Sequence, residues 1–344
     1  MRILFIKLRH IGDSLLLTPT IAATKQKFPE AEIWVLVRKS CDGILAGCPE
    51  IDRILCTANP DVSKRHKSEL LEDLKIALLL RKTRFDYVFE LTDNDRGRCF
   101  AVAARTRQRC TNTYPNLNRF WQFFFHRICE TERNNKHQVA IDYACPQAVL
   151  GLPEEPGPLR FDESRMKPWE TSVPLHAGSF VVIHFHTRWT RKAWPLDRWE
   201  RLIKGILERT PHVVLSCGPS AEEIAAARQL VEKCGPNVIS TFGKADWAKL
   251  AWILKRAAYF VGVDTAAMHI AAAAGCPTVC LFGPSPEMAY RPWQVKYCMI
   301  RPQDRLGADE IKNIPPEKLM LSIRVDWVLD DCRDFWTELI EFKK

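Results

Sequence analysis

The order of apolar and amphipathic segments limits this chain to one class of fold. Short apolar segments alternate with longer segments in which apolar residues recur at helical spacing, and this alternation occurs twice along the chain. The predicted strands are residues 2–8, 32–38, 85–91, 180–185, 212–218, 259–264 and 277–283. The predicted helices are residues 14–28, 66–84, 196–210, 220–235, 247–257 and 265–275. Strands that alternate with helices of this length form βαβ units, so the predicted class is α/β, doubly wound around parallel sheets.

The segment between the two alternations divides the chain. Residues 151–178 contain five prolines and show little periodicity, which is typical of a connection between domains. A length of 344 residues also favours two domains over one core. We therefore predict a Rossmann-like domain at 1–160, a linker at 161–178, a second Rossmann-like domain at 179–325 and a C-terminal helix at 326–344.

Composition narrows the class of protein. No apolar run approaches the roughly 20 residues that span a bilayer, and "MRILFIKLRH" at the N-terminus predicts a buried strand, since no signal-type cleavage site follows it. The thirteen cysteines are scattered without any C-x-x-C pair. We therefore expect reduced thiols in a cytoplasmic protein, with neither a disulfide framework nor a zinc site.

The net charge of +9 is unevenly placed. Residues 96–136 hold nine Lys or Arg against two acids, together with the aromatic stretch "RFWQFFFHR" at 119–127. Basic and aromatic residues together suit an anionic membrane surface, a phosphorylated amphiphile or a nucleic acid. A half-buried helix with its aromatic residues in the core explains the aromatics equally well, but leaves the excess of arginines unexplained.

"HIGDSLLLTP", residues 10–19, places a carboxylate where the first strand passes into the first helix. In open α/β sheets, ligands bind beyond the carboxyl ends of the strands. Gly12 allows the chain to turn there, and Asp13 follows it. Three roles are open for Asp13: a cap for a helix that begins at Ser14, a phosphate-side ligand for a metal, or a base that faces a cleft.

A second strand-to-helix junction is "IHFHTRWTRKAWP", residues 183–195. The hydroxyls of Thr187 and Thr190 and the ammonium of Lys192 follow a strand, so they can converge on a phosphate. The alternative is a solvated loop whose basic residues face water. The glycines of a P-loop are missing.

The third junction is "VGVDTAAMHIAAAAGCP", residues 261–277. Asp264 and Thr265 lie where a strand meets a helix, and free N–H groups with the helix dipole favour a diphosphate there. His269 follows Thr265 by one helical turn on the same face. A histidine in such a position is either a ligand-side residue or a buried core residue.

Two of these stretches together carry a family resemblance. "FIKLRHIGDSLLLTP" (5–19) and "FVGVDTAAMHIAAAAGCPTVCLFGP" (260–284) resemble the ADP-heptose:lipopolysaccharide heptosyltransferases, glycosyltransferase family 9, and the resemblance extends over essentially the whole chain. It implies the GT-B fold, in which two Rossmann-like domains face a central cleft. The N-terminal domain would bind the acceptor, the C-terminal domain the donor, and the C-terminal helix would pack back toward the N-terminal domain.

The resemblance also implies a reaction. Heptose would pass from ADP-L-glycero-β-D-manno-heptose, with inversion, onto a heptose of the lipopolysaccharide inner core. The acceptor would be a heptosylated Kdo-lipid A at the cytoplasmic face of the inner membrane, where the enzyme would be peripheral. Neither a metal nor another cofactor is expected.

Residue roles follow from the matched motifs. Asp13 matches the family's proposed catalytic base, and Ala266 stands where some relatives have glycine, which bears on how closely a ligand approaches the backbone there. The residues expected to bind the donor are Thr187, Thr190, Lys192, Glu222, Asp264, Thr265, Ala266 and His269, with Glu223 as the alternative to Glu222 for the ribose. The residues expected to bind the anionic acceptor are Lys7, Arg9, His10, Arg107, Arg109 and Arg119.

Three rival interpretations remain. Asp93 and Asp95 form a D-x-D pattern, which holds a divalent metal in glycosyltransferases of another fold, although a simple turn explains the pattern as well. A sugar-nucleotide epimerase would use the same two-domain architecture without a lipid acceptor. A nucleic-acid-binding protein would explain the charge but not the strand-to-helix junctions, so no nucleic-acid partner is expected.

Overall fold

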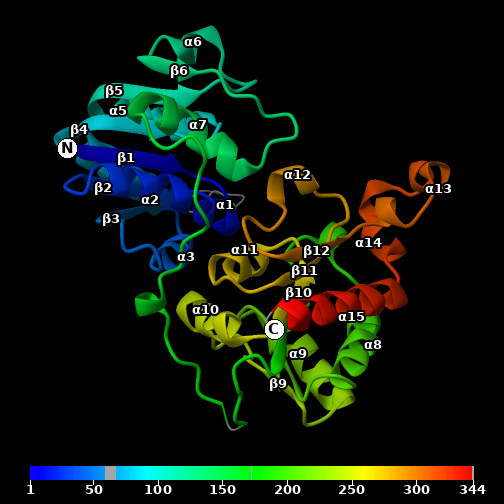
Figure 1. The fold of residues 1–344 in the computed structure, drawn as a ribbon. Coiled ribbons are helices and arrows are strands. Elements are labelled where there is room, and N and C mark those ends of the chain that lie inside the picture. Colours follow the sequence, from blue (N-terminus) through cyan, green and yellow to red (C-terminus); the bar gives the residue numbers. More distant parts are fainter. Residues whose placement is uncertain (59–66, 172, 343–344) are drawn as a thin grey trace. The chain divides into compact units, whose positions relative to one another are not determined.

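The chain forms two α/β units, Met1–Arg165 and Met166–Lys344 (Figure 1). The computed structural model describes residues 1–58, 67–171 and 173–342. Residue 66 of the predicted second helix, residue 172 of the predicted linker and residues 343–344 of the predicted C-terminal helix lie outside these ranges. The observed boundary falls inside the predicted linker, because the first unit retains the short 3₁₀ helix η1 (Glu163–Arg165).

A parallel sheet organises the described part of the first unit. Its six strands lie in the order β3-β2-β1-β4-β5-β6, and every adjacent pair is parallel. The strands are β1 (Arg2–Lys7), β2 (Glu32–Arg38), β3 (Arg53–Thr57), β4 (Arg84–Glu90), β5 (Arg105–Asn112) and β6 (Arg127–Cys129). The order reverses between β1 and β4, which is the switch point of a doubly wound sheet.

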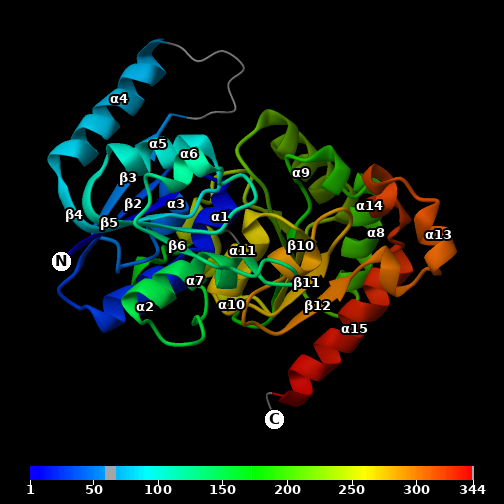
Figure 2. The same ribbon diagram turned by 90° about the horizontal axis from the view of Figure 1, so that it is seen from above.

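Helices cover both faces of this first sheet. They are α1 (Ile11–Leu15), α2 (Thr18–Lys27), α3 (Asp42–Leu45), α4 (Lys67–Lys82), α5 (Asp95–Ala103), α6 (Arg119–Gln122) and α7 (Gln138–Leu150). Figure 2 shows α2 beside α7 on one face and α4 beside α5 on the other. Because both faces are covered, the central strands β1 and β2 are almost entirely buried and consist largely of apolar residues.

The second unit repeats the plan. Its described residues form a six-stranded parallel sheet in the order β12-β11-β10-β7-β8-β9, with the switch point between β7 and β10. The strands are β7 (Phe180–His184), β8 (His212–Ser216), β9 (Val238–Ser240), β10 (Tyr259–Val263), β11 (Thr278–Leu281) and β12 (Tyr297–Ile300). Read from its other end, this order is β9-β8-β7-β10-β11-β12, which is the same strand topology as in the first sheet. The predicted pair of doubly wound units is therefore confirmed.

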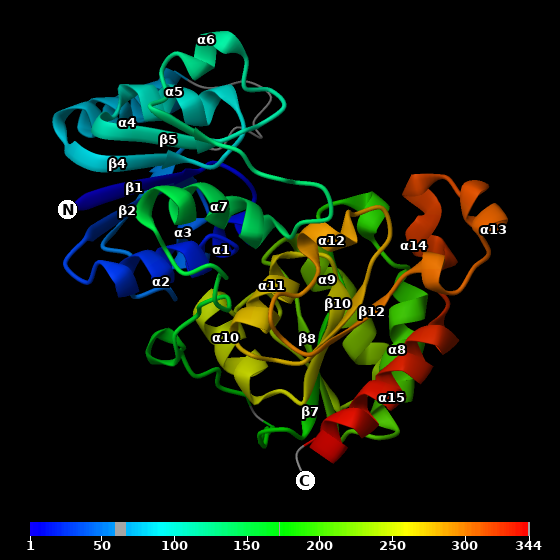
Figure 3. The same ribbon diagram turned by 45° about the horizontal axis from the view of Figure 1, so that its top comes forward.

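The helices of the second unit again form two layers. They are α8 (Leu196–Leu207), α9 (Ala221–Cys234), α10 (Trp247–Arg256), α11 (Ala266–Ala273), α12 (Glu287–Tyr290), α13 (Ala308–Lys312), α14 (Leu319–Ser322) and α15 (Val325–Phe342), with the 3₁₀ helices η2 (Thr190–Lys192), η3 (Pro302–Asp304) and η4 (Pro316–Lys318). In Figure 3, α15 runs beside α8, while α10 and α11 lie together.

The C-terminal helix α15 packs in the core of the second unit. Its apolar residues Val328, Cys332, Phe335 and Leu339 belong to the same core as α8 and β7. Within this unit the apolar face of the amphipathic helix meets α8 and β12. The expected packing of the helix toward the N-terminal domain stays a prediction.

Two further differences concern helices. The predicted helix at 14–28 is two helices, α1 and α2, and Pro19 lies in the first turn of α2, where proline costs no hydrogen bond. The basic segment 96–136 is not one helix but α5, β5, α6 and β6.

Among the described residues, all thirteen cysteines are free thiols. None of the described helices has both the length and the apolar character that crossing a bilayer requires.

Candidate active site

In the first unit, the loops after β1 and β4 are tied together at the switch point. The backbone N–H of Leu8 donates to Thr92 Oγ1 (2.9 Å), and Arg9 Nε donates to the carbonyl of Thr92 (2.7 Å). Arg9 and His10 therefore stand at the carboxyl ends of the strands, as predicted. The Arg38 guanidinium, at the end of β2, lies 3.4 Å from His10 Nδ1.

Asp13 is the third residue of α1. Its carboxylate accepts a hydrogen bond from the backbone N–H of His10 through Oδ2 (3.1 Å), so it takes part in capping from inside the helix and not as the predicted N-cap residue. The helix begins at Ile11 and not at Ser14, which moves the aspartate from the cap position into the first turn. A carboxylate has two oxygens, and this bond uses one of them. The cap and the proposed base are therefore compatible roles for one side chain.

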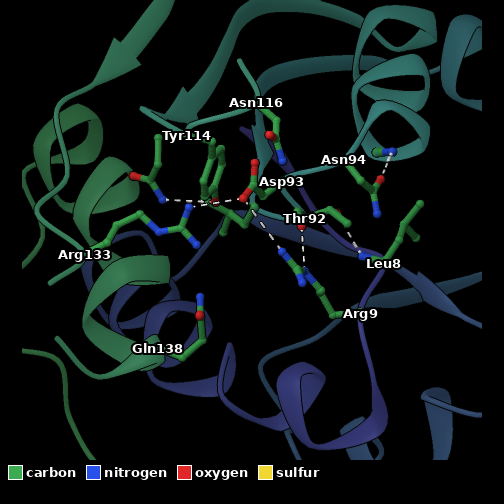
Figure 4. Close-up of polar contacts among 12 residues, drawn as sticks. Leu8, Arg9, Thr92, Asp93, Asn94, Tyr114, Asn116, Arg133 and Gln138 are labelled. Atoms are coloured by element: carbon green, nitrogen blue, oxygen red, sulfur yellow. Dashed lines mark hydrogen bonds and ion pairs between the residues drawn. The ribbon is translucent and has the colours of Figure 1, made fainter. Parts of the chain in front are cut away.

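Asp93 lies among three arginines, two of which, Arg9 and Arg133, are labelled in Figure 4. It is only 8% exposed, and Arg98 Nη2 and Arg133 Nη1 each lie 3.1 Å from its carboxylate, with Arg9 Nη2 at 3.9 Å. Its backbone has φ of 61°, a left-handed conformation that aspartate tolerates better than most residues. Arg9 and Arg133 stay partly exposed at this edge, with side chains that are 40% and 31% accessible to solvent.

The D-x-D pattern is thus a turn with ion pairs. Asn94 caps α5 by accepting from the Gly97 N–H (2.8 Å), and Asp95 pairs with Arg98 (2.9 Å). Among the described residues, no three His, Cys, Asp or Glu side chains gather in the way a metal site requires. The cations that Asp93 and Asp95 meet in this structure are guanidinium groups.

Lys7 does not face a ligand. It is 1% exposed, and its ammonium contacts both carboxylate oxygens of Asp142 on α7 (2.7 and 2.6 Å) and the carbonyl of Leu91 (3.1 Å). The prediction of an acceptor contact is corrected here. Alternate side chains of a strand lie on the same face, so Lys7 shares the α2–α7 face of β1 with Ile3 and Phe5. Its side chain is therefore buried in the protein, as theirs are.

The three arginines predicted farther along the chain are not at this edge either. Arg107 lies near the amino ends of the strands, 3.6 Å from Asp86. Arg109 donates to the carbonyls of Ala101 (2.6 Å) and Phe124 (2.7 Å), and it is a structural residue. Arg119 is exposed on α6. Of the predicted acceptor residues, the structure brings only Arg9 and His10 together.

Arg98 and Arg133 are functional candidates that sequence reasoning did not single out. Both belong to the basic segment 96–136, but only the fold shows which of its cations reach the switch point. The Arg133 guanidinium also lies over the ring of Tyr114, 5.1 Å from its centre. That contact fixes the orientation of the guanidinium on one side while Asp93 fixes it on the other.

Beneath this edge lies a buried carboxyl group, Glu90. Burial raises its pKa to about 7, against hydrogen bonds from Thr92 and Thr111 and the charge of Arg98, which favour the ionised form. The group supports the loop that carries Asp93, since its Oε1 accepts from the Thr92 N–H (2.8 Å). It is sealed from solvent and is therefore a supporting group.

In the second unit, an ion pair spans the switch point. Lys192, in η2 after β7, places its Nζ 2.5 Å from Oδ2 of Asp264, which follows β10. The two side chains are 19% and 8% exposed. The ammonium keeps further donors, since one of its three N–H groups serves Asp264. The two residues predicted from separate motifs are thus brought together.

The N-terminus of α11 adjoins this ion pair. Thr265 is the N-cap residue, but its side chain makes no capping hydrogen bond, and its buried Oγ1 has no hydrogen-bond partner. A buried hydroxyl without a partner is unfavourable in the free protein. Together with the N–H groups of the first helical turn, this hydroxyl fits an anionic ligand that supplies the missing partner. Ala266 is the first helical residue, half-buried at the same place.

The other predicted donor residues are arranged around this centre. Thr187 Oγ1 accepts from the Trp189 N–H (3.3 Å) and shapes the loop after β7, while Thr190 begins η2 with an exposed side chain. His269 is 3% exposed, and its backbone N–H donates to the Thr265 carbonyl (3.4 Å), which confirms the one-turn spacing.

Glu223, not Glu222, folds back to the strand ends. Its carboxylate accepts from the Gly218 N–H after β8 and from Ser220 Oγ (3.1 Å), and it lies 3.7 Å from His186 Nδ1. Glu222 is exposed in the first turn of α9. The helix period explains the difference, since adjacent residues point about 100° apart.

His184 and His186 were missed by the sequence reasoning. His184 ends β7, and its Nδ1 lies 2.9 Å from Ser216 Oγ at the end of β8. Burial lowers the pKa of His184 to about 4, so it is a neutral hydrogen-bonding group. The "HFH" spacing at a strand end was the available signal, because alternate residues of a strand lie on one face.

Each switch point therefore has its own chemistry. The first carries the half-buried carboxylate of Asp13 in the first turn of α1, and the partly exposed guanidinium groups of Arg9 and Arg133, which pair with Asp93. The second carries a lysine, an unpartnered hydroxyl and an uncapped helix N-terminus, which together suit a diphosphate. Both lie where ligands bind in doubly wound sheets.

Comparison with known proteins agrees with this arrangement. Residues 74–315, more than half of the chain, match the model of glycosyltransferase family 9 (heptosyltransferase). Lipopolysaccharide heptosyltransferase 3 of Escherichia coli K12 is 27% identical over 290 residues, which cover 83% of each chain. Lipopolysaccharide heptosyltransferase 1 of Pseudomonas aeruginosa is 25% identical over 303 residues, 83% of this chain and 79% of the relative.

Solved structures show the same fold. The E. coli heptosyltransferase WaaC with ADP aligns with a TM-score of 0.78 at 18% identity, over 97% of this chain and 100% of that one. The family 9 glycosyl transferase of Veillonella parvula aligns equally well, with a TM-score of 0.78 at 18% identity over 98% and 97% of the two chains. Because the family model matches more than half of the chain, the chain belongs to glycosyltransferase family 9, the heptosyltransferases, and is a glycosyltransferase.

Proposed function

We propose that this enzyme transfers L-glycero-D-manno-heptose, with inversion, from ADP-heptose onto a heptose of the lipopolysaccharide inner core. Within that reaction we propose the addition of the third heptose to the second. The support is the family membership, together with two E. coli relatives named lipopolysaccharide heptosyltransferase 3 that are each 27% identical to this chain. Relatives named heptosyltransferase 1 are 25% identical or less over comparable lengths, so addition to Kdo or to the first heptose is the second candidate.

The donor half rests on one observation, the unpartnered hydroxyl of Thr265 at the uncapped start of α11. We assign the ADP diphosphate to this position, with Lys192 as the counter-charge and Thr187 and Thr190 on the adjoining loop. Asp264 would then hold heptose hydroxyls while it orients Lys192. Ala266, His269 and a glutamate of α9 complete the proposed donor site. Glu223 is better placed than Glu222 for the ribose.

The chemical step follows from the residue types. Asp13 takes the proton of the acceptor hydroxyl as the oxygen bonds to the anomeric carbon, and the bond from that carbon to ADP breaks. The negative charge that builds up on the departing diphosphate is stabilised by Lys192 and by the N–H groups at the start of α11. This chemistry needs no metal and no further cofactor.

The acceptor half rests on the cations of the first switch point. Arg9 and Arg133 present guanidinium groups that Asp93 holds in place, and His10 lies beside Arg38. These groups suit the anionic substituents of a Kdo-lipid A acceptor that already carries heptose. Since such an acceptor is anchored in the cytoplasmic face of the inner membrane, we propose that the enzyme works there as a peripheral protein.

The deciding experiment measures ADP release from ADP-heptose by the wild type and by Asp13→Asn, with and without a heptosylated Kdo-lipid A acceptor, in EDTA. Asparagine can still accept from the His10 N–H, so the substitution removes the base while keeping the cap. Asp42→Asn is the matched control, an exposed first-turn aspartate in the neighbouring helix α3. The expected result is acceptor-dependent release that survives EDTA, persists in the control and collapses in Asp13→Asn.

Other results would redirect the assignment. An active Asp13→Asn enzyme would reduce Asp13 to a helix cap. Release abolished by EDTA would move the chemistry toward Asp93 and Asp95. Release of ADP without any acceptor would favour an epimerase or a hydrolase. Acceptors that carry one or two heptoses separate addition of the second heptose from addition of the third.

A further inference from the structure

The short helix α6 presents large aromatic side chains to solvent. Phe123 is 85% exposed and Phe120 is 64% exposed. Figure 1 shows α6 and β6 together at the β5 side of the first unit, where β6 is the edge strand of the sheet. Exposing two phenylalanines is unfavourable in water, and neighbouring exposed aromatic residues mark an interaction surface.

The segment that carries these rings is anchored to the protein. Asn118 caps α6 by accepting from the Trp121 N–H (3.1 Å), Phe125 is buried, and Trp121 packs against the core. Arg109 donates to the carbonyl of Phe124 (2.7 Å). The exposure of Phe120 and Phe123 is therefore a property of a fixed segment and not of a loose one.

The rings also support one another. Phe120 lies 5.2 Å from Trp121 and 5.3 Å from Phe124 between ring centres, and Phe123 lies 5.5 Å from Phe124, all with edge-to-face geometry. Such contacts hold the outward rings in place while their own outer faces stay free. The result is a rigid aromatic wedge, residues 119–124.

The charge of the residues around this wedge indicates which kind of surface it suits. No aspartate or glutamate occurs between residues 97 and 129, whereas Arg119, His126 and Arg127 are all exposed beside the wedge. Basic residues around aromatic side chains match an anionic bilayer, where the rings lie at the boundary of headgroups and acyl chains. A neutral protein partner would not require the absence of acids over so long a stretch.

A second exposed apolar row provides a contrast. Leu70, Leu74 and Leu78 lie along the outer face of α4 and are each about half exposed. Between residues 68 and 78, however, α4 carries three acids and one lysine. Anionic headgroups would be repelled there, so α4 is not expected to lie on the bilayer.

We infer that the α6 wedge is the element by which this enzyme docks on an anionic membrane, with Phe120 and Phe123 inserted among the headgroups and Arg119 and Arg127 at the phosphates. The inference rests on the proposed function, since a lipid-anchored acceptor requires the enzyme at the bilayer. It adds which element makes the contact. Arg119, predicted from sequence as an acceptor residue, takes the lipid phosphates in this assignment.

The test is sedimentation of the full chain with vesicles of phosphatidylcholine alone or mixed with phosphatidylglycerol, in the absence of donor and acceptor. Phe120→Ser with Phe123→Ser should weaken binding to the anionic vesicles roughly tenfold or more. Arg119→Gln with Arg127→Gln should weaken the same binding roughly tenfold and flatten its salt dependence. Leu74→Ser with Leu78→Ser is the matched control for lost exposed apolar area, and it should bind like the wild type.

Equal binding by the wild type and the phenylalanine variant would overturn the inference, and so would an equal loss in the α4 control. A phenylalanine variant that changes only the oligomeric state, with vesicle binding intact, would assign the wedge to a second copy of the chain. The proposed function is tested separately with ADP-heptose and an acceptor without acyl chains. There the phenylalanine variant should keep wild-type kcat and KM, so the two proposals can fail independently.

Discussion

At the scale of single residues, the donor assignment depends on one hydroxyl. Thr265→Val removes a buried group that has no partner in the free protein, so stability should stay within about 0.5 kcal/mol of the wild type or rise. If the hydroxyl binds the diphosphate, affinity for ADP should fall roughly tenfold, the cost of a hydrogen bond to a charged group. Calorimetric titration with ADP and urea denaturation measure the two quantities.

Thr278→Val provides the opposite pattern. Thr278 is fully buried in β11, and its hydroxyl donates to the carbonyl of Cys276 (3.0 Å). Its loss should cost about 1 kcal/mol of stability and leave ADP affinity unchanged. If Thr265→Val instead destabilised the protein and bound ADP normally, the diphosphate would have to be placed elsewhere.

Sequence reasoning located residues correctly where the position depends on the local chain. Asp264 and Thr265 lie at the predicted strand-to-helix junction, between β10 and α11, while their donor-binding role stays a prediction. Lys7 was assigned wrongly because its partner, Asp142, lies 135 residues away in sequence and only the fold brings α7 against β1. The alternation of Ile3, Phe5 and Lys7 on one face of β1 was a usable signal for its burial.

At the scale of elements, Arg109 joins three parts of the first unit. From β5 it donates to carbonyls at the end of α5 and to the carbonyl of Phe124 after α6. Arg109→Met keeps much of the stem but leaves these carbonyls without a donor, and should cost about 2–4 kcal/mol of stability. Hydrogen exchange across 119–126 should increase. Urea denaturation with peptide-resolved exchange measures both effects.

Arg107→Met is the control on the same strand. Arg107 is exposed and meets Asp86 at 3.6 Å, so its removal should change stability by less than about 0.5 kcal/mol. A stable Arg109→Met protein with weakened acceptor binding would restore the acceptor role predicted from sequence.

The elements themselves could be predicted where the strands are buried on both faces. Strands β1, β2, β7, β8 and β10 appear as apolar runs because helices cover both sides of each sheet. Strand β5 was missed because Arg105, Arg107 and Arg109 alternate along it, and the positive charge was read as a binding feature. The hydrogen bonds from Arg109 to carbonyls of other elements cannot be predicted from the sequence around it, because they depend on the fold.

At the scale of the whole molecule, two buried groups give the units opposite responses to pH. The folded first unit binds a proton at Glu90 more tightly than the unfolded chain does, because its pKa rises to about 7 from 4.5. The stability from this group is complete below about pH 4.5 and is lost as the pH rises through 7, a change of about 3 kcal/mol. His184 has its pKa lowered to about 4 from 6.5, so its contribution is complete above 6.5 and is lost as the pH falls toward 4.

Lowering the pH from 7.5 to 5 should therefore stabilise the first unit and destabilise the second. Hydrogen exchange of the slowest amides in β1 and β7, compared between variants at each pH, follows the two units separately. Glu90→Gln should remove the pH response in β1 and leave β7 unchanged, while His184→Gln should do the reverse. Responses of the same sign in both units, or responses that survive both substitutions, would show that other titrating groups control the acid stability of this enzyme.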